Sequence, residues 1–73
     1  MVQERVEVPI PGKIISVNVS VGSVVKEGDV LCILESMKME NPIVAPVTGT
    51  VTKIELSVGQ VVDTDDLVAI IEY

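Results

Sequence analysis

The sequence has 73 residues, and we expect one small domain with a limited hydrophobic core. Its net charge of −6 argues against nucleic acid as a partner, because proteins that bind DNA or RNA normally present a basic surface. The longest apolar runs have five residues, too few to cross a membrane or to form the core of a secretion signal, so we expect no direct membrane insertion.

The residues available for the core are almost entirely aliphatic. Sixteen valines and eight isoleucines stand against one aromatic residue, Tyr73, and β-branched side chains at this density favour strands over helices. The single cysteine, Cys32, lies in an apolar run and is predicted to be a buried, unreactive thiol. A lone cysteine excludes an internal disulfide and indicates a reducing, cytoplasmic location; without histidine, we expect no zinc site.

An internal repeat organises the chain. When the sequence is shifted by 37 positions, residues 9–35 align with residues 46–72 without a gap, and ten of the 27 pairs are identical. Extended backwards, the same shift aligns residues 39–44 with residues 2–7. Identical pairs include Pro9 and Pro46, Gly12 and Gly49, and Asp29 and Asp66. We therefore expect a single domain over residues 1–73, made of half-repeats at about 2–35 and 39–72.

Each half is predicted to contain the same strands in the same order. After Gly12 or Gly49, where a strand bends or another backbone comes close, alternating side chains predict strands at residues 13–19 and 50–56. A Val-Gly turn, a two-valine strand and a polar turn follow in both halves. Glycine at position 28 in the first polar turn aligns with Asp65 in the second, which predicts a positive φ at both positions.

The last strand of each half is a nearly continuous apolar run, at residues 30–34 and 67–71. Such a run indicates burial on more than one side, as in a barrel or a closely packed sandwich. No segment has convincing helical periodicity, so the sequence predicts an all-β domain of about eight short strands. An EF-hand calcium loop starting at Asp63 would need a glutamate at its twelfth position, which the sequence does not supply, so we interpret residues 63–66 as a solvated turn without a metal.

The repeat also predicts which strands lie side by side. In the first half, strands 30–35 and 39–44 are joined by a turn that contains Lys38. In the second half the corresponding strands are 67–72 and 2–7, and a turn between them would have to link Tyr73 to Met1. A pseudo-twofold domain therefore places Lys38 at one end and both chain termini at the other.

The turn sequence Glu35-Ser36-Met37-Lys38-Met39-Glu40 is the candidate functional site. A solvated lysine in a hairpin turn is the simplest interpretation. Exposed thioethers on both sides of that lysine are unusual, however, and they indicate a surface that a partner contacts. Catalysis by Lys38 itself is not expected, because a reactive lysine is normally buried or placed beside other cations, whereas this one is predicted at a wet turn apex.

The segment Ser36-Met37-Lys38-Met39, followed by Glu40-Asn41-Pro42-Ile43 and Ala45-Pro46-Val47-Thr48-Gly49, resembles the biotin-attachment motif of biotin carboxyl carrier domains. Upstream, Pro9-Ile10-Pro11-Gly12 and the stretch from Val21-Gly22 to Gly28-Asp29 also match, so the resemblance covers nearly the whole chain. One departure is the serine at position 36, where the family more often has alanine. The related lipoyl domains share the fold and the hairpin lysine but typically flank that lysine with aspartate and alanine.

This resemblance implies a flattened β-barrel made of two four-stranded antiparallel sheets, with biotin joined by an amide to Lys38. Ser36, Met37, Met39 and Glu40 then flank the attachment site; the methionines position the lysine, and Glu40 is a recognition charge. The implied partners are a biotin protein ligase, a biotin carboxylase and a carboxyltransferase. The chain itself is expected to be a carrier and not an enzyme.

The resemblance also narrows the type of carrier. The ungapped repeat leaves no room for the inserted "thumb" of some acetyl-CoA carboxylase carriers, so the chain looks like the thumbless carriers of acyl-CoA or pyruvate/oxaloacetate-class enzymes. Two alternatives stay open at this point. One is a lipoyl carrier domain of a 2-oxoacid dehydrogenase complex, and the other is an unmodified interaction module that uses the methionine-rich tip.

Overall fold

The computed structural model describes residues 2–73, and all regular structure within them is β-strand. The body measures 36 × 18 × 17 Å. Its strands, in chain order, are β1 (Gln3–Glu7), β2 (Gly12–Val17), β3 (Val24–Val25), β4 (Val30–Ser36), β5 (Met39–Val44), β6 (Gly49–Ile54), β7 (Val61–Val62) and β8 (Leu67–Glu72). No helix in this part of the chain has the length and apolar character needed to cross a bilayer.

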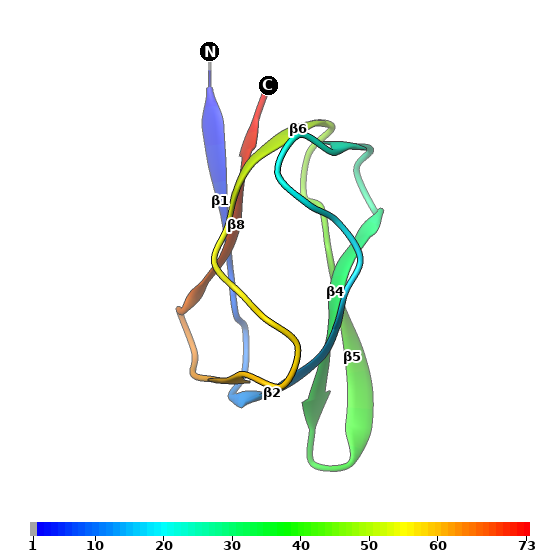
Figure 1. Cartoon of the computed structure of the whole chain (residues 1–73), viewed down its shortest axis with the longest axis vertical. Helices are drawn as coiled ribbons and strands as arrows, with labels where there is room; N and C mark the ends of the chain where they lie inside the picture. The colour runs from blue at the N-terminus through cyan, green and yellow to red at the C-terminus, as the bar shows by residue number, and fades with distance from the viewer. Residues whose placement is uncertain (1) are drawn as a thin grey trace.

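The strands form two antiparallel sheets that pack against each other as a flattened barrel (Figure 1). The first sheet has the order β1-β8-β6-β3, and the second has the order β5-β4-β2-β7. These sheets confirm the predicted all-β fold. A shift of 37 residues carries each strand of the first sheet onto a strand of the second, in the same order, so the sequence repeat is also a structural repeat.

Neither half of the repeat forms a sheet alone, because each sheet takes two strands from each half. The Val-Gly turns join the halves at equivalent places. Gly22 N donates to Val51 O at 2.8 Å, and Gly59 N donates to Ile14 O at 2.7 Å. Main-chain hydrogen bonds therefore link the two halves. Backbone N–H and C=O groups that are removed from water need such partners.

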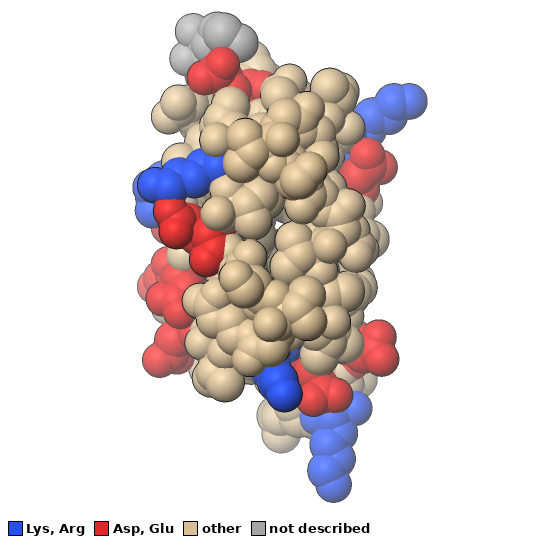
Figure 2. All heavy atoms as spheres, in the orientation of Figure 1, with Lys and Arg blue, Asp and Glu red and all other residues tan. Residues whose placement is uncertain are grey.

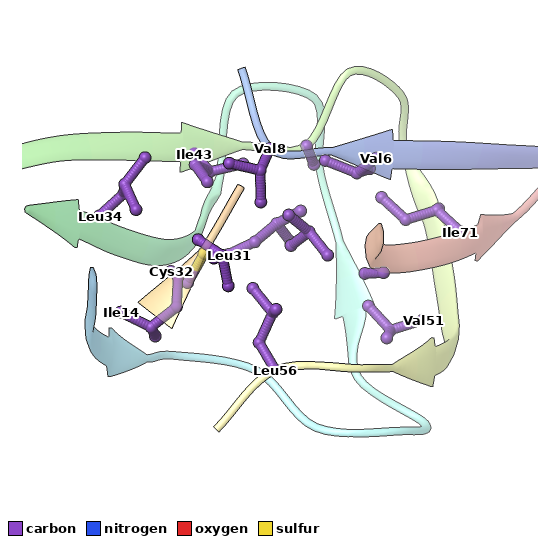
Figure 3. Close-up of a cluster of buried hydrophobic side chains, with 14 of the residues drawn as sticks. Val6, Val8, Ile14, Leu31, Cys32, Leu34, Ile43, Val51, Leu56 and Ile71 are labelled. Atoms are coloured by element: carbon purple, nitrogen blue, oxygen red, sulfur yellow. The ribbon is translucent and has the colours of Figure 1, made fainter. Parts of the chain in front are cut away.

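The core is built from aliphatic side chains of both halves together with Cys32 (Figure 3). Within residues 2–73 no polar or charged side chain is buried, so apolar burial stabilises the core. Burial raises the pKa of the Cys32 thiol to about 11, in agreement with the unreactive cysteine predicted from the sequence. The largest fully buried side chains are Ile14, Leu31, Leu34, Ile71, Val8, Val51, Val68 and Cys32.

Two predicted strands are shorter in the structure. The predicted strand 13–19 ends at Val17, and its counterpart 50–56 ends at Ile54. Val17 lies opposite Cys32, close to the start of β4, so few partner residues remain beyond it. The side chains that follow still pack against the core, which is why their alternation in the sequence extended the prediction too far.

The apolar run of β4 reflects a bulge as well as burial. The register of β4 against β5 shifts between Val30 and Cys32, and Leu31 and Cys32 are consequently both buried. Ile33, on the outer face, is only half-buried. The predicted burial on a second side is therefore partial.

Gly12 and Gly49 allow neighbouring strands to approach closely, as predicted. A Cβ atom on Gly12 would meet the carbonyl oxygen of Glu35 and would lie 2.8 Å from Cδ1 of Leu34. A Cβ atom on Gly49 would meet the carbonyl oxygen of Glu72 in the equivalent place. Glycine is thus required where β2 lies against the end of β4 and where β6 lies against the end of β8.

The two polar turns also have equivalent backbones. Gly28 has a φ of 93° and Asp65 has a φ of 72°, which confirms the prediction for this pair. In the acidic turn, Asp63 N donates to Asp66 Oδ2 at 2.8 Å, so this carboxylate stabilises the turn itself. Within residues 2–73 no group of three or more cysteine, aspartate or glutamate side chains is arranged to hold a metal ion.

Candidate functional site

The candidate site is the β-hairpin formed by β4 and β5. Ser36 lies opposite Met39 at the end of the ladder, and Met37 and Lys38 form the two-residue turn between them. Both turn residues have positive φ values, 53° for Met37 and 65° for Lys38, as in the type I′ turn, whose twist matches that of antiparallel strands. Residues other than glycine and asparagine are held in this conformation at a cost of about 1 kcal/mol each. The adjoining strands must therefore hold the turn.

The hairpin is anchored in the core close to its tip. Leu34 of β4 is fully buried and Ile43 of β5 is 6% exposed, so both strands are held by packing within a few residues of the turn. Asn41 Nδ2 donates to Met39 O at 3.2 Å and orders the start of β5. β5 is an edge strand, and Pro42 within it lacks the N–H that would pair with a further strand. The tip is therefore a rigid, preformed projection.

The structure brings the predicted site residues together at this tip. Met37 is 92% exposed and Met39 is 67% exposed, and Lys38 between them is also exposed. Within residues 2–73 the two ion pairs join Arg5 to Glu7 and Lys53 to Glu55, so Lys38 takes part in neither. In Figure 2 basic side chains project beyond the acidic ones at the end where Figure 1 places the β4–β5 turn.

A row of charged side chains crosses the second sheet one step behind the tip. Glu35 lies directly opposite Glu40 on β5 and directly opposite Lys13 on β2. All three residues are exposed, and residues opposite each other in a ladder point to the same face. We call Lys13, Glu35 and Glu40 the charged row. The predicted strands 30–35 and 39–44 would have set Glu35 opposite Met39, so neither the pair of Glu35 and Glu40 nor the position of Lys13 beside it was predicted from the sequence.

The opposite end of the barrel has the equivalent strand ends without a turn. Val2 N donates to Tyr73 O at 2.9 Å, and Tyr73 N donates to Val2 O at 2.9 Å. Under the shift of 37, Val2 corresponds to Met39 and Tyr73 corresponds to Ser36. Figure 1 shows the start of β1 and the end of β8 on this side and the β4–β5 turn on the other, as predicted from the repeat. The predicted approach of Met1 to Tyr73 lies outside the described residues.

The chemistry available at the tip is that of an exposed primary amine. Such an amine can attack an activated carboxyl group that a partner brings to it, and an amide results. The surface hollow of about 370 Å³ is lined by Glu55, Gln60, Asp66 and Leu67, none of which belongs to the hairpin. Lys38 thus stands on a convex projection, where any enclosed reaction site has to come from outside this domain.

A family model described as "Biotin-requiring enzyme" matches residues 4–71 of this chain. The matched range includes both halves of the repeat and the whole β4–β5 hairpin.

The chain is similar to the gamma subunits of two decarboxylases. It is 60% identical over 42 residues to methylmalonyl-CoA decarboxylase subunit gamma of Veillonella parvula, covering 58% of this chain and 33% of that protein. It is 62% identical over 39 residues to glutaconyl-CoA decarboxylase subunit gamma of Acidaminococcus fermentans, covering 53% of this chain and 27% of that protein. The aligned part of the chain thus spans no more than 33% of either relative.

The fold is similar to part of a much larger solved structure. The crystal structure of Kluyveromyces lactis urea carboxylase matches with a TM-score of 0.90 and 33% sequence identity. The match covers 99% of this chain and 6% of the urea carboxylase chain. The whole barrel therefore corresponds to one small part of that protein.

Proposed function

Since this chain belongs to the family of biotin-requiring enzymes, we propose that it carries its biotin as an amide of the Lys38 side chain. The chain is a biotin carrier domain of the kind found in biotin-dependent carboxylases and decarboxylases. The observation that supports Lys38 as the attachment residue is its position. It is exposed in a two-residue turn at the end of the barrel opposite Val2 and Tyr73.

Attachment requires a partner enzyme, because the tip itself offers no enclosed site. A biotin protein ligase would present biotin as its adenylate. The Lys38 ammonium first loses a proton, and its Nζ then attacks the activated carbonyl carbon. The new C–N bond forms, the bond from that carbon to the phosphate oxygen breaks, AMP leaves, and the nitrogen loses a second proton. Amide formation removes the positive charge of the lysine. Met37 and Met39 offer apolar contacts on either side of the reacting amine, Ser36 ends the strand before the turn, and Glu40 supplies a recognition charge.

After attachment, the role of the chain is to hold biotin and to deliver the carboxyl group that biotin carries. When bound, biotin supplies a carrier for a carboxyl group, which a biotin carboxylase loads from bicarbonate with ATP and a carboxyltransferase removes. The barrel holds the arm away from its own surface, and tethering raises the effective concentration of the group at both enzymes. The chain performs neither reaction, and it acts as the thumbless carrier of an acyl-CoA or pyruvate/oxaloacetate-class enzyme.

The test is the intact mass of the chain after co-expression with a biotin protein ligase. We expect the mass to rise by one biotinyl group, and peptide mapping to place that group on Lys38. Lys38→Arg should abolish the addition, whereas Lys53→Arg, which keeps the charge and lies outside the hairpin, should be biotinylated normally. An unmodified wild-type chain would contradict the proposal. Lipoylation by a lipoyl ligase without biotinylation would support the lipoyl alternative instead.

A further inference from the structure

Within residues 2–73 the sulfur atoms are divided sharply between the surface and the core. Met37 and Met39 are 92% and 67% exposed, and they flank Lys38 on either side. Cys32, by contrast, is 1% exposed. Burial raises the pKa of its thiol to about 11, so the thiolate that reacts with oxidants is scarce at neutral pH. An oxidant in solution therefore meets the methionines first.

The reaction open to these methionines is conversion to methionine sulfoxide by a hydroperoxide. The thioether needs no deprotonation, so access to solvent is the main requirement. With hydrogen peroxide, a sulfur lone pair attacks one oxygen, the O–O bond breaks and an S=O bond forms. The proton of that oxygen passes to the other oxygen, which leaves as water. The sulfur is oxidised by two electrons and the peroxide is reduced by two.

We propose that Met37 and Met39 form an oxidation-sensitive site that controls the use of Lys38. A hydroperoxide converts these side chains to sulfoxides, and the oxidised hairpin is a poorer substrate for attachment of biotin or for its later carboxylation. This inference rests on the proposed function of Lys38.

The position of the methionines makes recognition, and not folding, the step that oxidation affects. Both side chains lie outside the core, so an added oxygen disturbs no buried packing. Any protein that closes around the Lys38 amine must cover its immediate neighbours, because Met37 shares its turn and Met39 begins the next strand. Covering a sulfoxide oxygen with an apolar surface leaves a buried acceptor without a donor, and we expect about a tenfold loss of rate.

The modification is also reversible. Methionine sulfoxide reductases restore the thioether, with one class of enzyme for each of the two sulfoxide epimers. Oxidation at this site therefore differs from irreversible damage to a core residue. It switches the hairpin between an apolar and a polar surface on both sides of one lysine.

The experiment compares the full chain before and after treatment with hydrogen peroxide. Peptide mapping should find oxygen on Met37 and Met39 while Cys32 stays reduced, and the melting temperature should not change. The rate of biotin attachment by the ligase, and the rate of carboxylation of biotinylated chain by a biotin carboxylase with bicarbonate and ATP, are then measured. At least one of these rates should fall about tenfold and recover after treatment with both reductases.

Two variants make the test specific. Met37→Leu with Met39→Leu keeps an apolar tip, so its rates should be the same before and after peroxide; Met1 is present in every protein compared, so any effect of its oxidation is shared. Adding Val2→Met to that variant places an exposed methionine at the position equivalent to Met39 at the other end of the barrel, since Val2 is 57% exposed. Oxidation there should leave both rates unchanged.

Four outcomes would overturn the inference: wild-type rates that peroxide does not alter, oxidation of Cys32 before the methionines, a fall in melting temperature on oxidation, or equal losses in the leucine variant. A chain that accepts no biotin even without peroxide would contradict the proposed function instead.

Discussion

The two ends of the barrel consist of equivalent strand ends that finish differently. At one end Ser36 and Met39 lie opposite each other and are joined by a two-residue turn. At the other end Tyr73 and Val2 occupy the equivalent positions and exchange two main-chain hydrogen bonds without a turn. The fold therefore pairs these strands whether or not a turn joins them. The turn residues do not contribute to the core. The fold can therefore tolerate a strained backbone and exposed thioethers at these positions.

The two ends also differ in the charged side chains that lie next to them. Behind the tip, the charged row has three ionised side chains, and its two glutamates lie directly opposite each other. The equivalent row of the first sheet is Thr50, Glu72 and Gln3, with a single charge. Like charges directly opposite in a ladder are destabilising, so the fold alone does not explain the second glutamate at the lysine end. Comparing equivalent positions at the two ends thus distinguishes the residues that the fold requires from the residues that belong to the candidate site.

The largest loss of stability is expected from substitutions at core positions that are equivalent in the two halves. Val25 and Val62 are equivalent and each is 2% exposed, so an aspartate at either position buries an unpaired carboxylate and should destabilise the fold by about 4 kcal/mol or more. Thermal unfolding measures this loss. Their strand neighbours Val24 and Val61 are 78% and 77% exposed, and aspartate at those positions should be tolerated. A chain that stays folded with Val25→Asp or Val62→Asp would argue against the repeat-based core.

An intermediate effect on stability should distinguish the end with the β4–β5 turn from the end without a turn. Gly12→Ala pushes a methyl group against the Leu34 side chain and the Glu35 carbonyl, where the adjacent turn limits movement, and we expect a loss of about 1–3 kcal/mol. Gly49→Ala meets the equivalent Glu72 carbonyl and the Ile71 side chain at the end without a turn, so the chain can shift and the loss should be smaller. Urea unfolding of the two variants gives the comparison. Equal losses would show that the turn does not stiffen its end of the barrel.

The smallest effect concerns the charges of the two rows. Glu40→Gln removes one of two facing carboxylates and should raise stability by about 0.3 kcal/mol. Gln3→Glu creates the same pair with Glu72 and should lower stability slightly more, because Thr50 offers no neighbouring cation in the place of Lys13. Both effects should shrink at high salt. Changes of the same sign in the two variants, measured by urea unfolding, would contradict this account of the rows.

Much of the fold could be predicted because the repeat is carried by local patterns. Alternating side chains, paired glycines and matching turns recur at one spacing, and the structure confirms the eight strands and the positive φ of Asp65. The ends of strands were less predictable. Side-chain alternation continues past Val17, but hydrogen bonding depends on where the neighbouring strand begins, and that is not a local property of the sequence.

The candidate site was also predicted only in part from the sequence. The sequence alone was enough to place Lys38 in a hairpin turn between two exposed methionines, and the attachment role of Lys38 stays a prediction for the mass measurement to test. A bulge in β4 and the half-exposed Ile33 were not visible in the sequence, because a continuous apolar run reads the same whether one face or both are covered.

By itself, the sequence determined that a turn containing Lys38 joins strands at residues 30–35 and 39–44. The structure shortens this turn to Met37 and Lys38, and the pairing of the strands then sets Glu35 opposite Glu40. Only the tertiary structure decided that Lys13 lies beside this pair. The physical reason is distance along the chain. Pairing of β2 with β4 depends on both halves packing around one shared core, and no short segment contains that information.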